Sequence, residues 1–88
     1  MNDLVVKFLS QTDRESRSIN VYKLAGIGYL EDTLIATGSL NLCSNVAHIT
    51  ILPAHKEAYE DMELEIENAI EERDIYDRRI LIENYYRG

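Results

Sequence analysis

The segment from Val46 to Asp74 constrains the fold more than any other part of the chain. Residues 46–52 (VAHITIL) alternate along a predicted strand, and one set of side chains is wholly apolar and should face a core. That set is Ala47, Ile49 and Ile51. Pro53 ends the strand and suits the first turn of a helix. Residues 54–74 then have the periodicity of a long amphipathic helix, which predicts a helix packed on a sheet.

The predicted helix has an apolar side and an acidic side. At about 100° per residue, the core stripe comprises Ala58, Tyr59, Met62, Ile66, Ala69, Ile70 and Arg73. The opposite side and its flanks carry Glu57, Glu60, Asp61, Glu63, Glu67, Glu71, Glu72 and Asp74. Leu64 projects near the middle of these acids, about 160° from Ile66 by helix geometry.

Three further strands are predicted before this segment, at residues 3–9, 18–25 and 34–42. Polar residues 11–18 predict a loop, Gly26 and Gly28 a bend, and Ser44-Asn45 a hairpin turn. Residues 76–87 fit either a final strand at about 78–86 or a continued helix, and we favour the strand because it is rich in Ile and Tyr. The prediction is one α+β domain over residues 1–88, with order ββββαβ, about five mainly antiparallel strands and one helix on one face.

From Tyr29 to about residue 84 the order of segments resembles the central part of GNAT-type N-acetyltransferases. LEDTLIATGSL resembles the hairpin of that family, VAHITILP its next strand, the 54–74 helix its cofactor-side helix, and ILIEN the strand after it. The resemblance implies a shared scaffold. The glycine-bearing loop that holds the acyl-CoA pyrophosphate has no counterpart, because the stretch here reads AHKEAYED.

The formal net charge of −7 is concentrated in the C-terminal part. Residues 1–52 hold four basic and five acidic side chains, a balance of −1, whereas residues 53–88 hold five and eleven, a balance of −6. This disfavours direct nucleic-acid binding and favours a basic protein surface as partner. With the lone Cys43, no signal peptide and no apolar run of about 20 residues, we expect a cytoplasmic location without membrane insertion.

Only Cys43, His48 and His55 invite nucleophilic or metal chemistry. Neither the spacing of a zinc site nor that of a nucleophile motif is present, so these residues are interpreted as structural. The carboxylates lie along a helix side rather than in a cleft, which does not suit acid–base catalysis. We therefore predict no catalytic residue, no cofactor and no metal.

The favoured hypothesis is a small non-enzymatic inhibitor or adaptor. It would dock the acidic helix side, with Leu64 as an apolar anchor, on a basic surface of a partner that itself binds nucleic acid. By analogy of charge and size, some phage anti-restriction and anti-CRISPR proteins act in the cytoplasm of an infected host as nucleic-acid mimics. The alternatives left open are acids that serve solvation alone, a shortened acetyltransferase-like domain, and a homodimer that uses Tyr85 and Tyr86.

Overall fold

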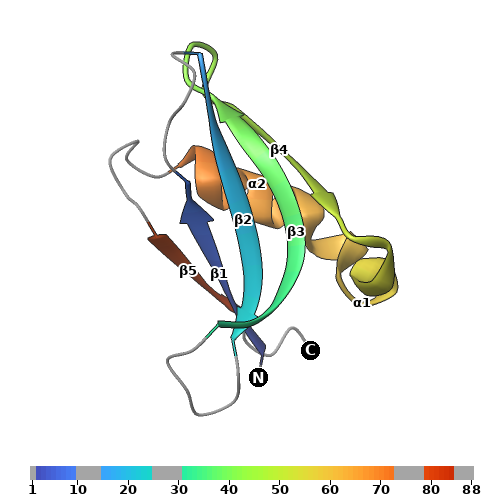
Figure 1. The fold of residues 1–88 in the computed structure, drawn as a ribbon. Coiled ribbons are helices and arrows are strands. Elements are labelled where there is room, and N and C mark those ends of the chain that lie inside the picture. Colours follow the sequence, from blue (N-terminus) through green and yellow to red (C-terminus); the bar gives the residue numbers. More distant parts are fainter. Residues whose placement is uncertain (1, 10–14, 25–30, 73–78, 85–88) are drawn as a thin grey trace.

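A computed structural model of the chain describes residues 2–9, 15–24, 31–72 and 79–84. Its strands form one antiparallel sheet in the order β4-β3-β2-β1-β5 (Figure 1). They are β1 (Asn2–Phe8), β2 (Ser16–Leu24), β3 (Glu31–Asn41), β4 (Val46–Ile51) and β5 (Arg79–Asn84). A helical segment after β4 crosses one face of the sheet. The predicted α+β class, with four antiparallel strands followed by a helix, is confirmed.

The helical segment is interrupted rather than continuous. It consists of the 3₁₀ turn η1 (Pro53–His55), α1 (Lys56–Tyr59), the 3₁₀ turn η2 (Glu60–Met62) and α2 (Glu63–Glu71). The helix predicted at about 54–74 is thus present from Pro53 to Glu71, but 3₁₀ turns interrupt it, and 73–74 lie outside the described residues. A 3₁₀ turn aligns residues three apart, which fits the burial of both Tyr59 and Met62.

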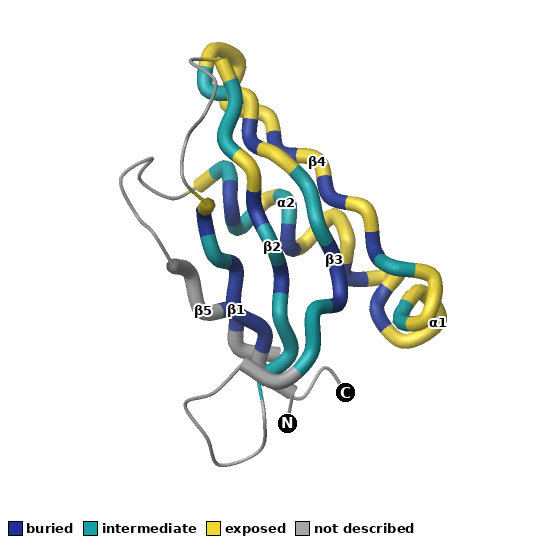
Figure 2. Tube along the Cα trace, viewed as in Figure 1, coloured by how far each residue is buried: buried dark blue, intermediate teal, exposed yellow. Residues whose placement is uncertain are grey.

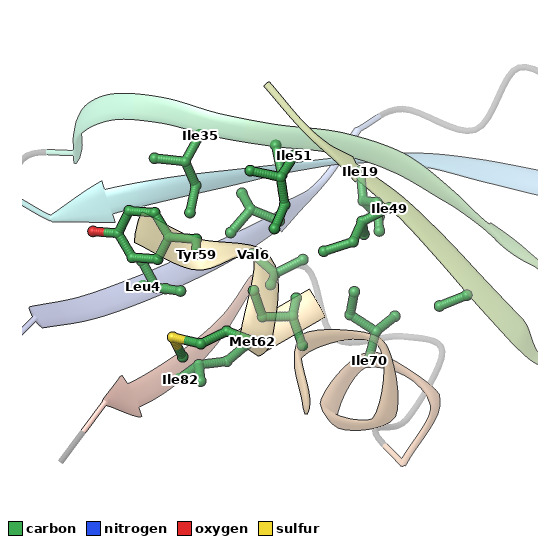
Figure 3. Packing of buried hydrophobic residues seen from close by; sticks show 14 of the residues in the cluster. Leu4, Val6, Ile19, Ile35, Ile49, Ile51, Tyr59, Met62, Ile70 and Ile82 are labelled. Atoms are coloured by element: carbon green, nitrogen blue, oxygen red, sulfur yellow. The ribbon is translucent and has the colours of Figure 1, made fainter. Parts of the chain in front are cut away.

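The core lies between the sheet and this segment. From the helical side, Tyr59, Met62, Ile66 and Ile70 pack against strand residues that include Leu4, Val6, Ile19, Ile35, Ile49, Ile51 and Ile82 (Figure 3). Along β4, buried and exposed residues alternate as predicted (Figure 2). Ala69 is partly buried against the cluster, but Ala58 is exposed, so its predicted place in the core stripe is wrong. The 3₁₀ turns on both sides of α1 change which residues of this short helix face the sheet.

Strand β3 curves through an irregularity in its pairing with β2. The register shifts between Val21 and Tyr22, whose partners are Ala36 and Leu34, so Ile35 is an extra residue on β3. Ile35 and Ala36 are both buried in the core. β3 also begins at Glu31, earlier than the predicted residue 34, because Leu24 and Glu31 continue the ladder.

Gly38 is required where β3 passes close to β4. A Cβ atom at this position would overlap the His48 carbonyl oxygen and would lie 2.8 Å from the Ile49 Cα. Both neighbours are main-chain atoms, which have little freedom to move aside. The absence of a side chain therefore allows the two strands to approach each other here.

The hairpin between β3 and β4 turns at residues 42–45, where Ser44-Asn45 predicted a turn. The Asn41 Oδ1 accepts hydrogen bonds from the N–H groups of Cys43 (2.9 Å) and Ser44 (3.0 Å), as in an Asx turn. Asn45 adopts a φ of 59°, in the left-handed region that Asn tolerates better than most residues.

Candidate functional site

The outward side of the helical segment is strongly acidic. Its exposed acids, which we call the acidic face, are Glu57, Glu60, Asp61, Glu63, Glu65 and Glu72. Between residues 53 and 72 the only lysine or arginine is Lys56, so pairing within the segment cannot neutralise the face. Of the predicted partner-binding residues, the structure thus exposes Glu57, Glu60, Asp61, Glu63, Leu64 and Glu72, while Asp74 lies outside the described residues.

Leu64 is an apolar side chain within the acidic face. It is 67% exposed, the largest exposed fraction among the large hydrophobic residues that the structure describes. It lines an open depression of about 470 Å³, whose other described lining residues are Asp61, Glu65, Asn68, Ala69 and Glu72. The exposed Leu64 side chain is therefore an apolar spot on the surface, and carboxylates border it.

Glu67 and Glu71 do not belong to this outward face, which corrects their predicted placement. Both are half-buried and reach the neighbouring edge of the sheet. The Ala47 N–H donates to Glu71 Oε2 at 2.7 Å, and the Ile49 N–H donates to Glu67 Oε2 at 2.9 Å. Helical periodicity places these carboxylates on the acidic side and its flanks, but their long side chains extend sideways to β4.

Asn45 ties the hairpin to the end of α2. Its side-chain Nδ2 donates to the main-chain oxygen of Glu71 at 2.9 Å. Because the last carbonyls of a helix lack partners within the helix, this bond satisfies one of them. Together with the Ala47–Glu71 bond, it fixes the C-terminal half of the segment against β4, which leaves the acidic face on the outside.

Cys43, His48 and His55 lie before, within and after β4, respectively. Cys43 is exposed in the turn before the strand, and His55 is in the 3₁₀ turn after it. The six residues of β4 span about 20 Å. His48 is exposed in the middle of the strand, on the face opposite the buried Ala47 and Ile49. Among the described residues, no group of three or more His, Cys, Asp or Glu side chains is placed to hold a metal ion.

The sheet face away from the helix has a different character. The Lys7 ammonium lies 5.7 Å from the centre of the Tyr22 ring, and Asn20 Nδ2 donates to the Tyr22 hydroxyl at 3.3 Å. Ser39 and Thr50 are exposed on the same side as His48, in neighbouring strands. This face offers positions at which charge can be altered without touching the acidic face.

Sequence reasoning missed two residues that line the depression. Glu65 lies four residues after Asp61, and Asn68 lies four residues after Leu64, so both continue rows that a helical projection contains. Extending those rows from Asp61 and Leu64 would have found them. By contrast, no sequence signal distinguishes the sideways reach of Glu67 and Glu71 from exposure to solvent.

No family model matches the chain, and no curated protein or solved structure does so either. The acetyltransferase resemblance therefore stays a prediction. Among the described residues, no helix is both long enough and apolar enough to cross a bilayer.

Proposed function

We propose that the protein is a non-enzymatic binding module that docks its acidic face on a basic surface of a partner protein. The observation that carries this proposal is the division of the helix carboxylates. Glu67 and Glu71 are engaged with β4, whereas the acids around Leu64 are exposed and border an open depression.

The charge balance supports a basic partner. Like charges at helical spacing repel one another, and one lysine offsets little of this cost. A surface of Lys and Arg residues would remove the repulsion on binding and would speed the encounter by electrostatic steering. Surfaces that hold nucleic acid are rich in these residues. The partner we propose is therefore a nucleic-acid-binding protein, which this chain would inhibit as an acidic mimic in the cytoplasm, as phage anti-restriction and anti-CRISPR proteins do.

Leu64 gives such an interface its apolar centre. Protein interfaces commonly have an apolar core within a polar rim, and the rim charges contribute more to association rate than to affinity. Leu64 beside Ala69, with Asp61, Glu65 and Glu72 around them, matches that arrangement on a small scale. Exposed single leucines also occur without function, so the test must separate this leucine from the charges.

The test is capture of partners from a cell lysate by immobilised protein. We compare the wild type with Glu60→Gln/Glu63→Gln, with Leu64→Ala and with Ser39→Lys/Thr50→Lys. The first and the last variant each change the net charge by +2, from −7 to −5 (−7 + 2). Only the first alters the acidic face, so the last controls for net charge.

The proposal expects a basic protein that the wild type captures at low salt and loses at high salt. Glu60→Gln/Glu63→Gln and Leu64→Ala should each recover less of it, while Ser39→Lys/Thr50→Lys should recover as much as the wild type. Thermal unfolding confirms that each variant is folded. Equal recovery by all four proteins would remove the acidic face from the function.

A further inference from the structure

β4 is an edge strand of the described sheet, because β3 is its only neighbouring strand there. All six of its residues pair with β3, and the N–H groups of Ala47 and Ile49 donate to the helix carboxylates on the other side of the strand. Exposed edges of this kind are templates on which another strand can add. The edge is thus a potential interaction surface independent of the acidic face.

The strand itself contains none of the usual protection against such pairing. Its sequence, VAHITI, has no Lys, Asp, Glu, Pro or Gly, and it is rich in β-branched residues. Protection comes instead from another element. The N–H donors belong to Ala47 and Ile49, two residues apart on β4, and the carboxylate acceptors belong to Glu71 and Glu67, four residues apart on α2. Each carboxylate oxygen occupies the position that a main-chain carbonyl oxygen of an added strand would take.

We propose that the β4 edge is a latent pairing surface for the β4 strand of a second copy of this chain, and that Glu67 and Glu71 keep it closed. Antiparallel pairing about a two-fold axis would place Ile49 opposite Ile49 and Ala47 opposite Ile51. This register keeps the buried set of each strand on one face of a joined sheet, because buried odd-numbered residues pair with each other and exposed even-numbered residues, such as His48 and Thr50, pair with each other. Both copies would use the same β4 edge, as a closed two-fold dimer requires.

The experiment is sedimentation velocity over a range of protein concentrations. Glu67→Ala/Glu71→Ala removes both acceptors, and Glu60→Ala/Glu63→Ala removes the same charge from exposed positions. The first variant should form a dimer or larger species as concentration rises, while the control should sediment as the wild type. The first variant sedimenting as the wild type at every concentration would overturn the proposal, as would equal association by both.

A second pair of substitutions shows whether any association uses β4. His48→Lys and Thr50→Lys, added to Glu67→Ala/Glu71→Ala, place lysines opposite each other in the expected register. They should abolish the association, and association that persists would contradict pairing through this edge. If the double alanine variant does not fold, the single variants Glu67→Ala and Glu71→Ala are compared in the same way, with weaker association expected of each.

Discussion

The carboxylate of Glu71 accepts a hydrogen bond from the main-chain N–H of Ala47, with 2.7 Å between Oε2 and N. This contact joins the last turn of α2 to the edge strand β4. Four residues earlier, Glu67 makes the equivalent contact with Ile49. The two glutamates attach the helical segment to β4, and the acids of the acidic face point to the other, outward side of the segment.

Glu71→Ala should lower the free energy of unfolding by about 1–3 kcal/mol, because it leaves the partly buried Ala47 N–H without its acceptor. Glu72→Ala, at the exposed neighbour, should change it by less than about 0.5 kcal/mol. Urea unfolding measures both. Equal values for the two variants would show that the Glu71 contact contributes nothing to stability.

Asn45 should tolerate Gly better than Ala. Both changes remove the bond from Asn45 Nδ2 to the Glu71 carbonyl, but only Ala also meets the steric cost of a φ of 59°. That cost is about 1–2 kcal/mol. Urea unfolding of Asn45→Gly and Asn45→Ala should differ by this amount, with the Gly variant more stable. A more stable Ala variant would contradict the turn geometry.

Gly38→Ala should destabilise the fold by about 2 kcal/mol or more, since its Cβ would meet the His48 carbonyl oxygen. Thermal unfolding is suitable, with Ser39→Ala as the exposed control in the same strand. The control should unfold close to the wild type. A Gly38→Ala protein as stable as the control would contradict the close approach of β3 and β4 at this position.

Ile66→Ala and Leu64→Ala test which side of α2 faces the sheet. Ile66 is fully buried, so its truncation should cost about 2–5 kcal/mol, whereas the exposed Leu64 should cost less than about 0.5 kcal/mol. Urea unfolding of the two variants should therefore give well-separated midpoints. A larger loss for Leu64→Ala would reverse the orientation of the helix.

The sequence predicted those features that follow from periodicity. Alternation identified the buried side of β4, and the three- and four-residue spacing of Tyr59, Met62, Ile66 and Ile70 identified the core side of the helix. It did not predict the 3₁₀ turn at Glu60–Met62, because the same apolar spacing suits a continuous helix. The predicted stripe failed at Ala58, in α1 just before that turn.

The candidate site was predicted only in part for a different reason. A helical projection gives the direction of each Cβ atom but not the course of a long side chain. Glu67 and Glu71 leave the helix on its acidic side and then reach the β4 main chain, which depends on how closely the helix and the sheet edge pack. Tertiary contacts of this kind separate the carboxylates that are bonded to β4 from those of the acidic face.

The most direct test of this division is the Kd of the captured basic partner for two variants with equal charge. Glu60→Gln/Glu63→Gln and Glu67→Gln/Glu71→Gln each remove two negative charges, and Gln retains a carbonyl oxygen that can still accept from β4. We predict about a five- to tenfold weaker Kd for the first, or about 0.5–0.7 kcal/mol per carboxylate, and a Kd close to that of the wild type for the second. Equal weakening by both variants, or greater weakening by the second, would contradict the assignment of binding to the acidic face.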